Sequence, residues 1–166
     1  MIRNLHHNAY RCRDSEETRH FYEDFLGLPL VETLLIELSK TGRATNTLHT
    51  FYRLDDGSHP AFFQAPDMPF EVKPQHDFDL HIALEVGIEA LQPMLAKGRV
   101  MGIETRGPSD HGMIDSIYFR DPNGYVIELT AKTGDHARHM DPATNGAREK
   151  LDRWEREKAT RSAREG

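Results

Sequence analysis

DPNGYVIEL, residues 121–129, combines a turn and a strand, and the rest of the fold can be worked out from it. Pro and Gly favour the backbone angles of a tight turn, so residues 121–124 are predicted to end one strand and start another. The stretches at 114–120 and 125–131 are therefore predicted to pair as a hairpin. Glu128 lies on the second strand of that hairpin.

The residues before this hairpin supply three more elements. Residues 79–86 alternate between polar and apolar side chains, which predicts a strand. Residues 88–97 are predicted to form a short amphipathic helix that ends at Gly98, and residues 102–106 a weak strand. The second half of the chain is thus predicted to run strand, helix, strand, strand, strand.

The first half of the chain repeats that order. An alternating strand at 6–12 leads to Asp14 and Ser15, either of which can cap the helix predicted at 16–26. Three strands with turns between them follow, at 30–38, 48–54 and 61–65. The chain is therefore predicted to contain two copies of a βαβββ unit.

Four segments are expected along the chain. They are a first unit at 1–66, a proline-rich linker at 67–76, a second unit at 77–133, and a charged C-terminal helical tail at 134–166. The predicted fold class is α+β, with the two units forming a curved, mostly antiparallel sheet around a metal cavity, plus a C-terminal helix.

Composition excludes several classes of protein. The formal net charge is −6 and the two units contain no basic stripe with interleaved aromatics, so neither nucleic acid nor an anionic membrane is an expected partner. Cys12 is the only cysteine, which excludes an intramolecular disulfide and cysteine-rich zinc sites. Because the sequence has no bilayer-length apolar run and no signal-peptide pattern at its start, a cytoplasmic protein is expected.

Two histidines and a carboxylate occupy matching places in the two units. His7 and His81 lie on the first strand of each unit, and Glu128 lies on the last strand of the second. These side chains can converge on one ion if the sheets curve around a common cavity. Two imidazoles and a carboxylate leave coordination positions open, and they suit Fe(II), Mn(II), Ni(II), Co(II) or Zn(II) better than Ca(II) or Mg(II).

The motifs around these residues resemble one known family. HNAYRCRD at 7–14 and HFYEDFLG at 20–27 resemble the opening of the vicinal oxygen chelate superfamily. That superfamily includes glyoxalase I, extradiol dioxygenases, fosfomycin-resistance proteins and bleomycin-binding proteins. LHIAL at 80–84 and DPNGYVIEL at 121–129 resemble hallmarks of its second unit, so the resemblance covers about residues 5–131.

The resemblance implies the metal ligands, the kind of substrate and the assembly. His7, His81 and Glu128 would hold one divalent ion, on which two adjacent oxygens of a small substrate chelate. The resemblance also implies a homodimer. In such a dimer the three ligands come either from one chain or from two, and in the second case the metal lies at the interface.

Three functions fit this resemblance, and the favoured one is extradiol ring cleavage of a catechol with Fe(II). Such dioxygenases carry a tyrosine ten residues before the glutamate ligand, and Tyr118 matches that position. They also use one or two further histidines near the metal. His59 and His111 lie close to those positions in the sequence, although not in register with them, and are candidates for that role.

The second function is that of a glyoxalase-like lyase, isomerase or thiol transferase, and the third is binding of a small molecule without catalysis. Glyoxalase I has a fourth ligand at the end of the first unit's last strand, where this chain has Gln64, a poor base. Arg11, His49 and Phe51 are expected to line the substrate cavity, with Arg11 binding an anionic group of the substrate.

Overall fold

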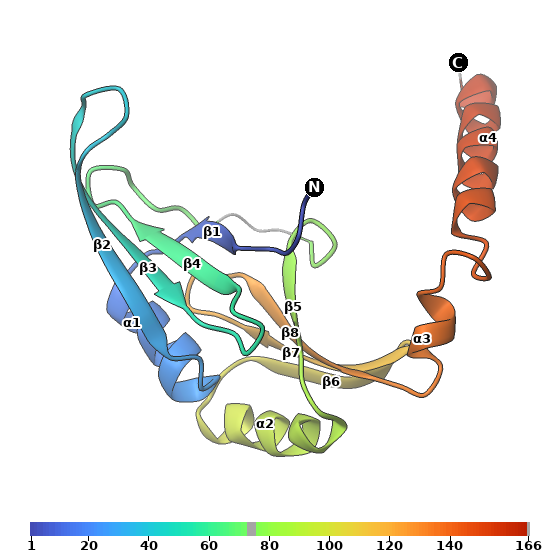
Figure 1. Ribbon diagram of the computed structural model, residues 1–166, viewed down its shortest axis with the longest axis horizontal. Coiled ribbons are helices and arrows are strands. Elements are labelled where there is room, and N and C mark those ends of the chain that lie inside the picture. Colours follow the sequence, from blue (N-terminus) through green and yellow to red (C-terminus); the bar gives the residue numbers. More distant parts are fainter. Residues whose placement is uncertain (73–75, 166) are drawn as a thin grey trace.

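The computed structural model of the protein describes residues 1–72 and 76–165, so residues 73–75 of the expected linker and the last residue of the expected tail lie outside the described residues. The described strands form two four-stranded sheets, one above the other in the view of Figure 1. Each sheet is formed by one half of the chain, as the duplication predicts.

The first sheet carries one helical segment. Its elements in chain order are β1 (His7–Arg11), α1 (Ser15–Arg19), η1 (His20–Phe25), β2 (Leu30–Leu38), β3 (Ala44–Tyr52) and β4 (His59–Gln64).

The second sheet has the same order and is followed by the tail. Its elements are β5 (His81–Glu85), α2 (Ile88–Val100), β6 (Thr105–Asp110), β7 (Ile114–Arg120) and β8 (Val126–Lys132), and the tail contains α3 (His136–His139) and α4 (Ala147–Glu165).

Both sheets have the same strand connections. The order is β1-β4-β3-β2 in the first and β5-β8-β7-β6 in the second. The first strand of each unit runs parallel to the last, and the other neighbours are antiparallel. The predicted α+β fold class, with two mostly antiparallel βαβββ units and a C-terminal helix, is confirmed.

The first helix differs from the prediction in its hydrogen bonding. Asp14 is the N-cap, and its carboxylate accepts hydrogen bonds from the backbone amides of Glu16 and Glu17. From His20 onward the helix widens into the π-helix η1. At its end the Leu26 amide donates to the Phe21 carbonyl, five residues earlier in the chain. The spacing of apolar residues in the sequence cannot distinguish an α-helix from a π-helix here, because both bury the same aromatic side chains.

The expected end of α2 at Gly98 is wrong, because the helix continues to Val100. A Cβ atom at position 98 would lie 2.6 Å from the Phe119 ring and 2.8 Å from the Thr105 side chain. Gly98 therefore permits close packing of the helix on its sheet and does not end the helix.

One hydrophobic core joins the two units. The rings of Phe25 on η1 and Phe119 on β7 meet edge to face, with centroids 5.0 Å apart.

The turn between β7 and β8 adds hydrogen bonds to this contact between the two units. The Asp121 carboxylate accepts hydrogen bonds from the fully buried Tyr22 hydroxyl at 3.1 Å and from the backbone amides of Asn123 and Tyr125. Asn123 in turn accepts a hydrogen bond from the backbone amide of Arg13.

The tail extends away from this core. In Figure 1, α4 stands apart from both sheets, and its Leu151 and Trp154 side chains are exposed. Among the described residues, none of the helices combines the length and the apolar character that crossing a membrane requires.

Replacing Asp121 by alanine is expected to destabilise the protein strongly. The change leaves the Tyr22 hydroxyl and two backbone amides without their acceptor, and each buried unsatisfied donor costs on the order of 1 to 3 kcal/mol. The free energy of unfolding, measured with urea, should fall by about 3 kcal/mol or more. The control is Asp55→Ala in an exposed turn, where a change below about 0.5 kcal/mol is expected. Equal urea midpoints for the two variants would contradict the role given to Asp121 in the contact between the two units.

Candidate metal centre

A cavity of about 580 Å³ lies on the face of the second sheet that carries His81 and Glu128. The strand register explains why these residues meet. Glu128 pairs with Ala83 on one side and with Tyr118 on the other, while His81 pairs with Val126. Paired residues share a face, so both ligand candidates and Tyr118 point to the same side of the sheet.

Hydrogen bonds fix which nitrogen of His81 is available to a metal. Its Nδ1 lies 3.0 Å from the Asp77 carbonyl oxygen, which can only accept, so Nδ1 carries the proton. The other nitrogen, Nε2, lies 3.4 Å from Glu128 Oε2 and holds a lone pair when the ring is neutral. A backbone carbonyl that orients the imidazole in this way is a common support of metal-binding histidines.

The donor atoms of this pair fit a divalent ion. Metal bonds of about 2.1 Å at ordinary coordination angles place two neighbouring ligand atoms roughly 3.0 to 3.4 Å apart. The observed separation of 3.4 Å falls in that range. The Glu128 side chain is only 7% exposed, and a buried carboxylate needs a compensating positive charge. An ion between these two residues would supply that charge.

Tyr118 and His111 extend the cluster. The Tyr118 hydroxyl lies 3.3 Å from Glu128 Oε1 and 2.8 Å from His111 Nε2. A phenol has one hydrogen, so when Tyr118 donates to the carboxylate, His111 donates to Tyr118. Burial and the neighbouring Glu128 carboxylate raise the pKa of Tyr118, which keeps the phenol protonated near neutral pH.

His7 lies in the other sheet, among different side chains. Its ring centroid is 6.1 Å from that of His49 and 5.4 Å from that of Phe51. His59 pairs with His7 in the register and shares its face. Across residues 1–72 and 76–165 of one chain, no group of three His, Cys, Asp or Glu residues is close enough to hold a metal ion. Within one chain, the candidate ligands are therefore divided between the sheets, with His7 in the first and His81 and Glu128 in the second.

His49 and His59 have fixed orientations. The buried His49 ring donates from Nδ1 to the Phe62 carbonyl at 3.0 Å and stacks on Phe63 at a centroid distance of 3.6 Å. Burial lowers the pKa of His49, so the ring is neutral near pH 7. His59 donates from Nδ1 to the His6 carbonyl at 3.2 Å. Both rings lie on the face of the first sheet that carries His7.

Gln64 is a correction to the sequence analysis, because it faces away from His7. It pairs with Leu48, on the opposite face of the sheet, and its side-chain oxygen accepts a hydrogen bond from the Ser15 amide at 2.7 Å. The register makes Ala61 the position that corresponds to Glu128. The first unit therefore has no polar side chain where the second has its carboxylate, and Gln64 helps to cap α1 instead.

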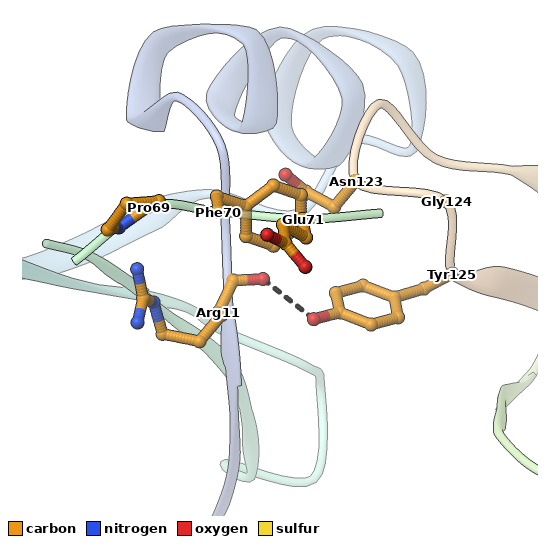
Figure 2. A pocket seen from close by; sticks show the side chains of 7 residues that line it. All are labelled: Arg11, Pro69, Phe70, Glu71, Asn123, Gly124 and Tyr125. Atoms are coloured by element: carbon orange, nitrogen blue, oxygen red, sulfur yellow. Dashed lines mark hydrogen bonds between the residues drawn. The ribbon is translucent and has the colours of Figure 1, made fainter. Parts of the chain in front are cut away.

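Arg11 is a second correction. It lies on the expected face, but its guanidinium donates to the Met68 carbonyl at 2.7 Å and to the Ala65 carbonyl at 3.5 Å. It lines a separate cavity of about 410 Å³ between β1, the linker and the β7–β8 turn. Figure 2 shows this cavity, in which the Tyr125 hydroxyl donates to the Arg11 carbonyl. Arg11 therefore holds the linker and does not point to His81 and Glu128.

Two residues that the sequence did not indicate line the same cavity as His81 and Glu128, namely Asp77 and Arg106. Arg106 lies opposite Tyr118 in the register, with its guanidinium carbon 4.6 Å from the Tyr118 ring centroid. The alternation of side chains along β6 could have placed Arg106 on this face. Asp77 lies in a loop, and no periodic pattern in the sequence marks it.

Comparisons with known proteins identify the family and the fold. The model of the glyoxalase/bleomycin resistance protein/dioxygenase superfamily matches residues 4–129. Among curated proteins, no sequence matches the chain. A solved glyoxalase/dioxygenase from Nostoc punctiforme is 25% identical, with a TM-score of 0.62 over 79% of this chain and 92% of that one.

Solved structures of the fosfomycin resistance protein FosX share the fold. The Listeria monocytogenes protein, solved with Mn(II) and a sulfate ion, is 20% identical with a TM-score of 0.60, over 83% of this chain and 99% of that one. The Mesorhizobium loti protein is 21% identical with a TM-score of 0.61, over 83% and 98% of the two chains.

Replacing Glu128 by glutamine tests whether this carboxylate holds a metal. Residues that merely support a ligand contribute about 10- to 100-fold in metal affinity, so the Mn(II) dissociation constant should rise by about 100-fold or more in isothermal titration calorimetry. The matched control is Glu85→Gln. Glu85 is exposed, lies on the same face of the sheet, and forms an ion pair with Lys132. That variant should bind Mn(II) like the wild type, and equal losses in both variants would exclude a specific role for Glu128.

Proposed function

Since the chain belongs to the glyoxalase/bleomycin resistance protein/dioxygenase superfamily, we propose that it is a divalent-metal enzyme whose active site is shared between two subunits. In this proposal His81 and Glu128 of one subunit hold the ion together with His7 of the partner subunit. The substrate is a small molecule with two adjacent oxygens, and the favoured reaction is extradiol cleavage of a catechol with Fe(II).

The separation of the two partial sites supports the shared arrangement. His81 and Glu128 lie 3.4 Å apart in the second sheet, whereas His7 lies beside His49 and Phe51 in the first. A twofold dimer can place the first sheet of each subunit against the second sheet of the other, so that both sites are completed by one contact. The His7 face would then add His49, His59 and Phe51 to the wall of the shared cavity.

A metal bound at this site would act as a Lewis acid on two adjacent substrate oxygens. The chain's own residues would orient the substrate and move protons. Tyr118 stays protonated and lies 3.3 Å from Glu128, so its hydroxyl can donate to a substrate oxygen as negative charge develops there. His111, at 2.8 Å, can return the proton to Tyr118.

The Tyr118–His111 pair is the observation that favours ring cleavage. A catechol loses a hydroxyl proton when it binds as a chelate, and the His111 imidazole, hydrogen-bonded to the protonated Tyr118, can accept and return that proton. Both atoms of O2 enter the ring-opened product, so the reaction consumes no other reductant. Met113, Ile114 and Val126 give the cavity an apolar wall that suits a ring.

The glyoxalase-like alternative loses one of its two supports. Gln64 caps α1 on the other face of the sheet and is not a fourth ligand, whereas the match of the motifs around His81 and Glu128 still fits this alternative. The first unit offers no base for moving a proton between two carbons at the position that corresponds to Glu128, because Ala61 stands there. Isomerisation of a hemithioacetal is therefore the comparison reaction in the activity test.

Subunit mixing tests the shared site. Dimers of His7→Ala and dimers of Glu128→Gln should each have low metal content, because each lacks one ligand in both sites. A mixed dimer, isolated with two different affinity tags, rebuilds one of its two sites and should hold about half the metal of the wild type. If the mixed dimer binds no more metal than the two parents, the shared arrangement is wrong.

Oxygen uptake tests the reaction. The Fe(II)-loaded wild type should consume O2 with a catechol, and Tyr118→Phe should lower kcat by about 100-fold or more, the usual contribution of a proton-transfer group. The control is Tyr52→Phe, because the buried Tyr52 hydroxyl has no hydrogen-bond partner among the described residues. Hemithioacetal turnover without oxygen uptake would favour the glyoxalase-like function instead.

A further inference from the structure

Asp77 connects the two edges of the second sheet. It lies four residues before His81 at the β5 edge, yet its carboxylate is 2.5 Å from the guanidinium of Arg106 on β6, the opposite edge. It also lies 3.4 Å from the guanidinium of Arg120 on β7. Arg106 and Arg120 pair in register with Tyr118 and Val126, on the face of the cavity. The loop that carries Asp77 therefore crosses this face and is held by two cations.

The backbone of Asp77 reaches one candidate ligand. Its carbonyl oxygen accepts the Nδ1 proton of His81 at 3.0 Å, which leaves Nε2 to face Glu128. An imidazole in solution exchanges between two tautomers, so a fixed acceptor on one nitrogen selects the tautomer that can bind a metal through the other. The carbonyl keeps this position only while the loop keeps its own.

The side chain of Asp77 reaches the other candidate ligand through two neighbours. Arg106, which it pairs with, lies over the Tyr118 ring at 4.6 Å from the centroid. The Tyr118 hydroxyl lies 3.3 Å from Glu128 Oε1. A single residue is thus connected to His81 by its backbone and to Glu128 through Arg106 and Tyr118.

We propose that Asp77 is the positioning residue of this metal centre: its carboxylate clamps the 76–79 loop across the sheet so that its carbonyl selects the His81 tautomer and Arg106 supports Tyr118 against Glu128. The inference rests on the proposed function for the role of His81 and Glu128 as ligands. It does not require Asp77 to touch either the metal or the substrate.

The test uses Asp77→Ala in the full chain, with two independent readouts. The first is Mn(II) affinity by isothermal titration calorimetry, where the dissociation constant should rise by about 10- to 100-fold, as for other residues that orient a ligand. The second is long-range ¹H–¹⁵N NMR of the metal-free protein, at a pH where His81 is neutral. The wild type should show the Nδ1–H tautomer, and the variant should show a mixture.

Glu104→Ala is the matched control. It removes another carboxylate that lies 3.4 Å from Arg120, but it leaves the contact between Asp77 and Arg106 intact. Its Mn(II) affinity and its His81 tautomer should match the wild type. Asp77→Asn serves if the alanine variant fails to fold, because asparagine keeps the shape and loses the charge. Its affinity should fall in the same direction.

The outcomes separate this proposal from the proposed function. Wild-type affinity together with a single His81 tautomer in the Asp77 variants overturns the positioning role. If the wild type itself binds no Mn(II), the proposed metal enzyme fails, but the tautomer measurement still decides whether Asp77 orients His81. Loss of affinity with a tautomer mixture, absent in Glu104→Ala, supports the proposal.

Discussion

The contact between His81 and Glu128 is the constraint on which the account of this protein depends. The buried Glu128 carboxylate lies 3.4 Å from His81 Nε2, while Nδ1 of the same ring donates to the Asp77 carbonyl. At this distance an unprotonated Nε2 and the carboxylate repel each other unless a proton or a metal ion lies between them, and in the proposed function a metal ion takes that place. The sheet register supplies the contact, because His81 and Glu128 lie on adjacent strands and share a face. The polar side chains of the cavity are arranged around this pair.

The packing of the two units explains why one chain holds only part of the candidate centre. The β7–β8 turn binds the first helix through Asp121 and Asn123, and the aromatic core between Phe25 and Phe119 fixes the sheets relative to each other. With the units joined in this way, His7 lies with His49 and Phe51, and no group of three possible ligands forms within the described parts of the chain. In the proposed function a second subunit completes the centre, and that arrangement requires no change in this core.

The sequence predicted the repeat and many of the strands, because alternation and turn residues are local properties. The strands at 30–38 and 114–120 have the predicted bounds, and Asp14 caps the first helix. Side-chain alternation also placed His7 and Arg11 on one face of β1. Gln64 was misplaced because its face depends on the register of β4 against β3, which the sequence does not reveal. Asp77 was missed for a similar reason, since its role arises from two arginines on distant strands. The separation of His7 from His81 follows from packing between the units, which no local pattern encodes.

Anomalous diffraction from crystals grown with Mn(II) tests the central claim most directly. The account predicts one strong peak per subunit at the manganese absorption edge, bonded to His81 Nε2, to the Glu128 carboxylate and to His7 of the partner subunit. A peak that lies away from His81 and Glu128, or an ion coordinated there with His7 of neither chain, would contradict the account.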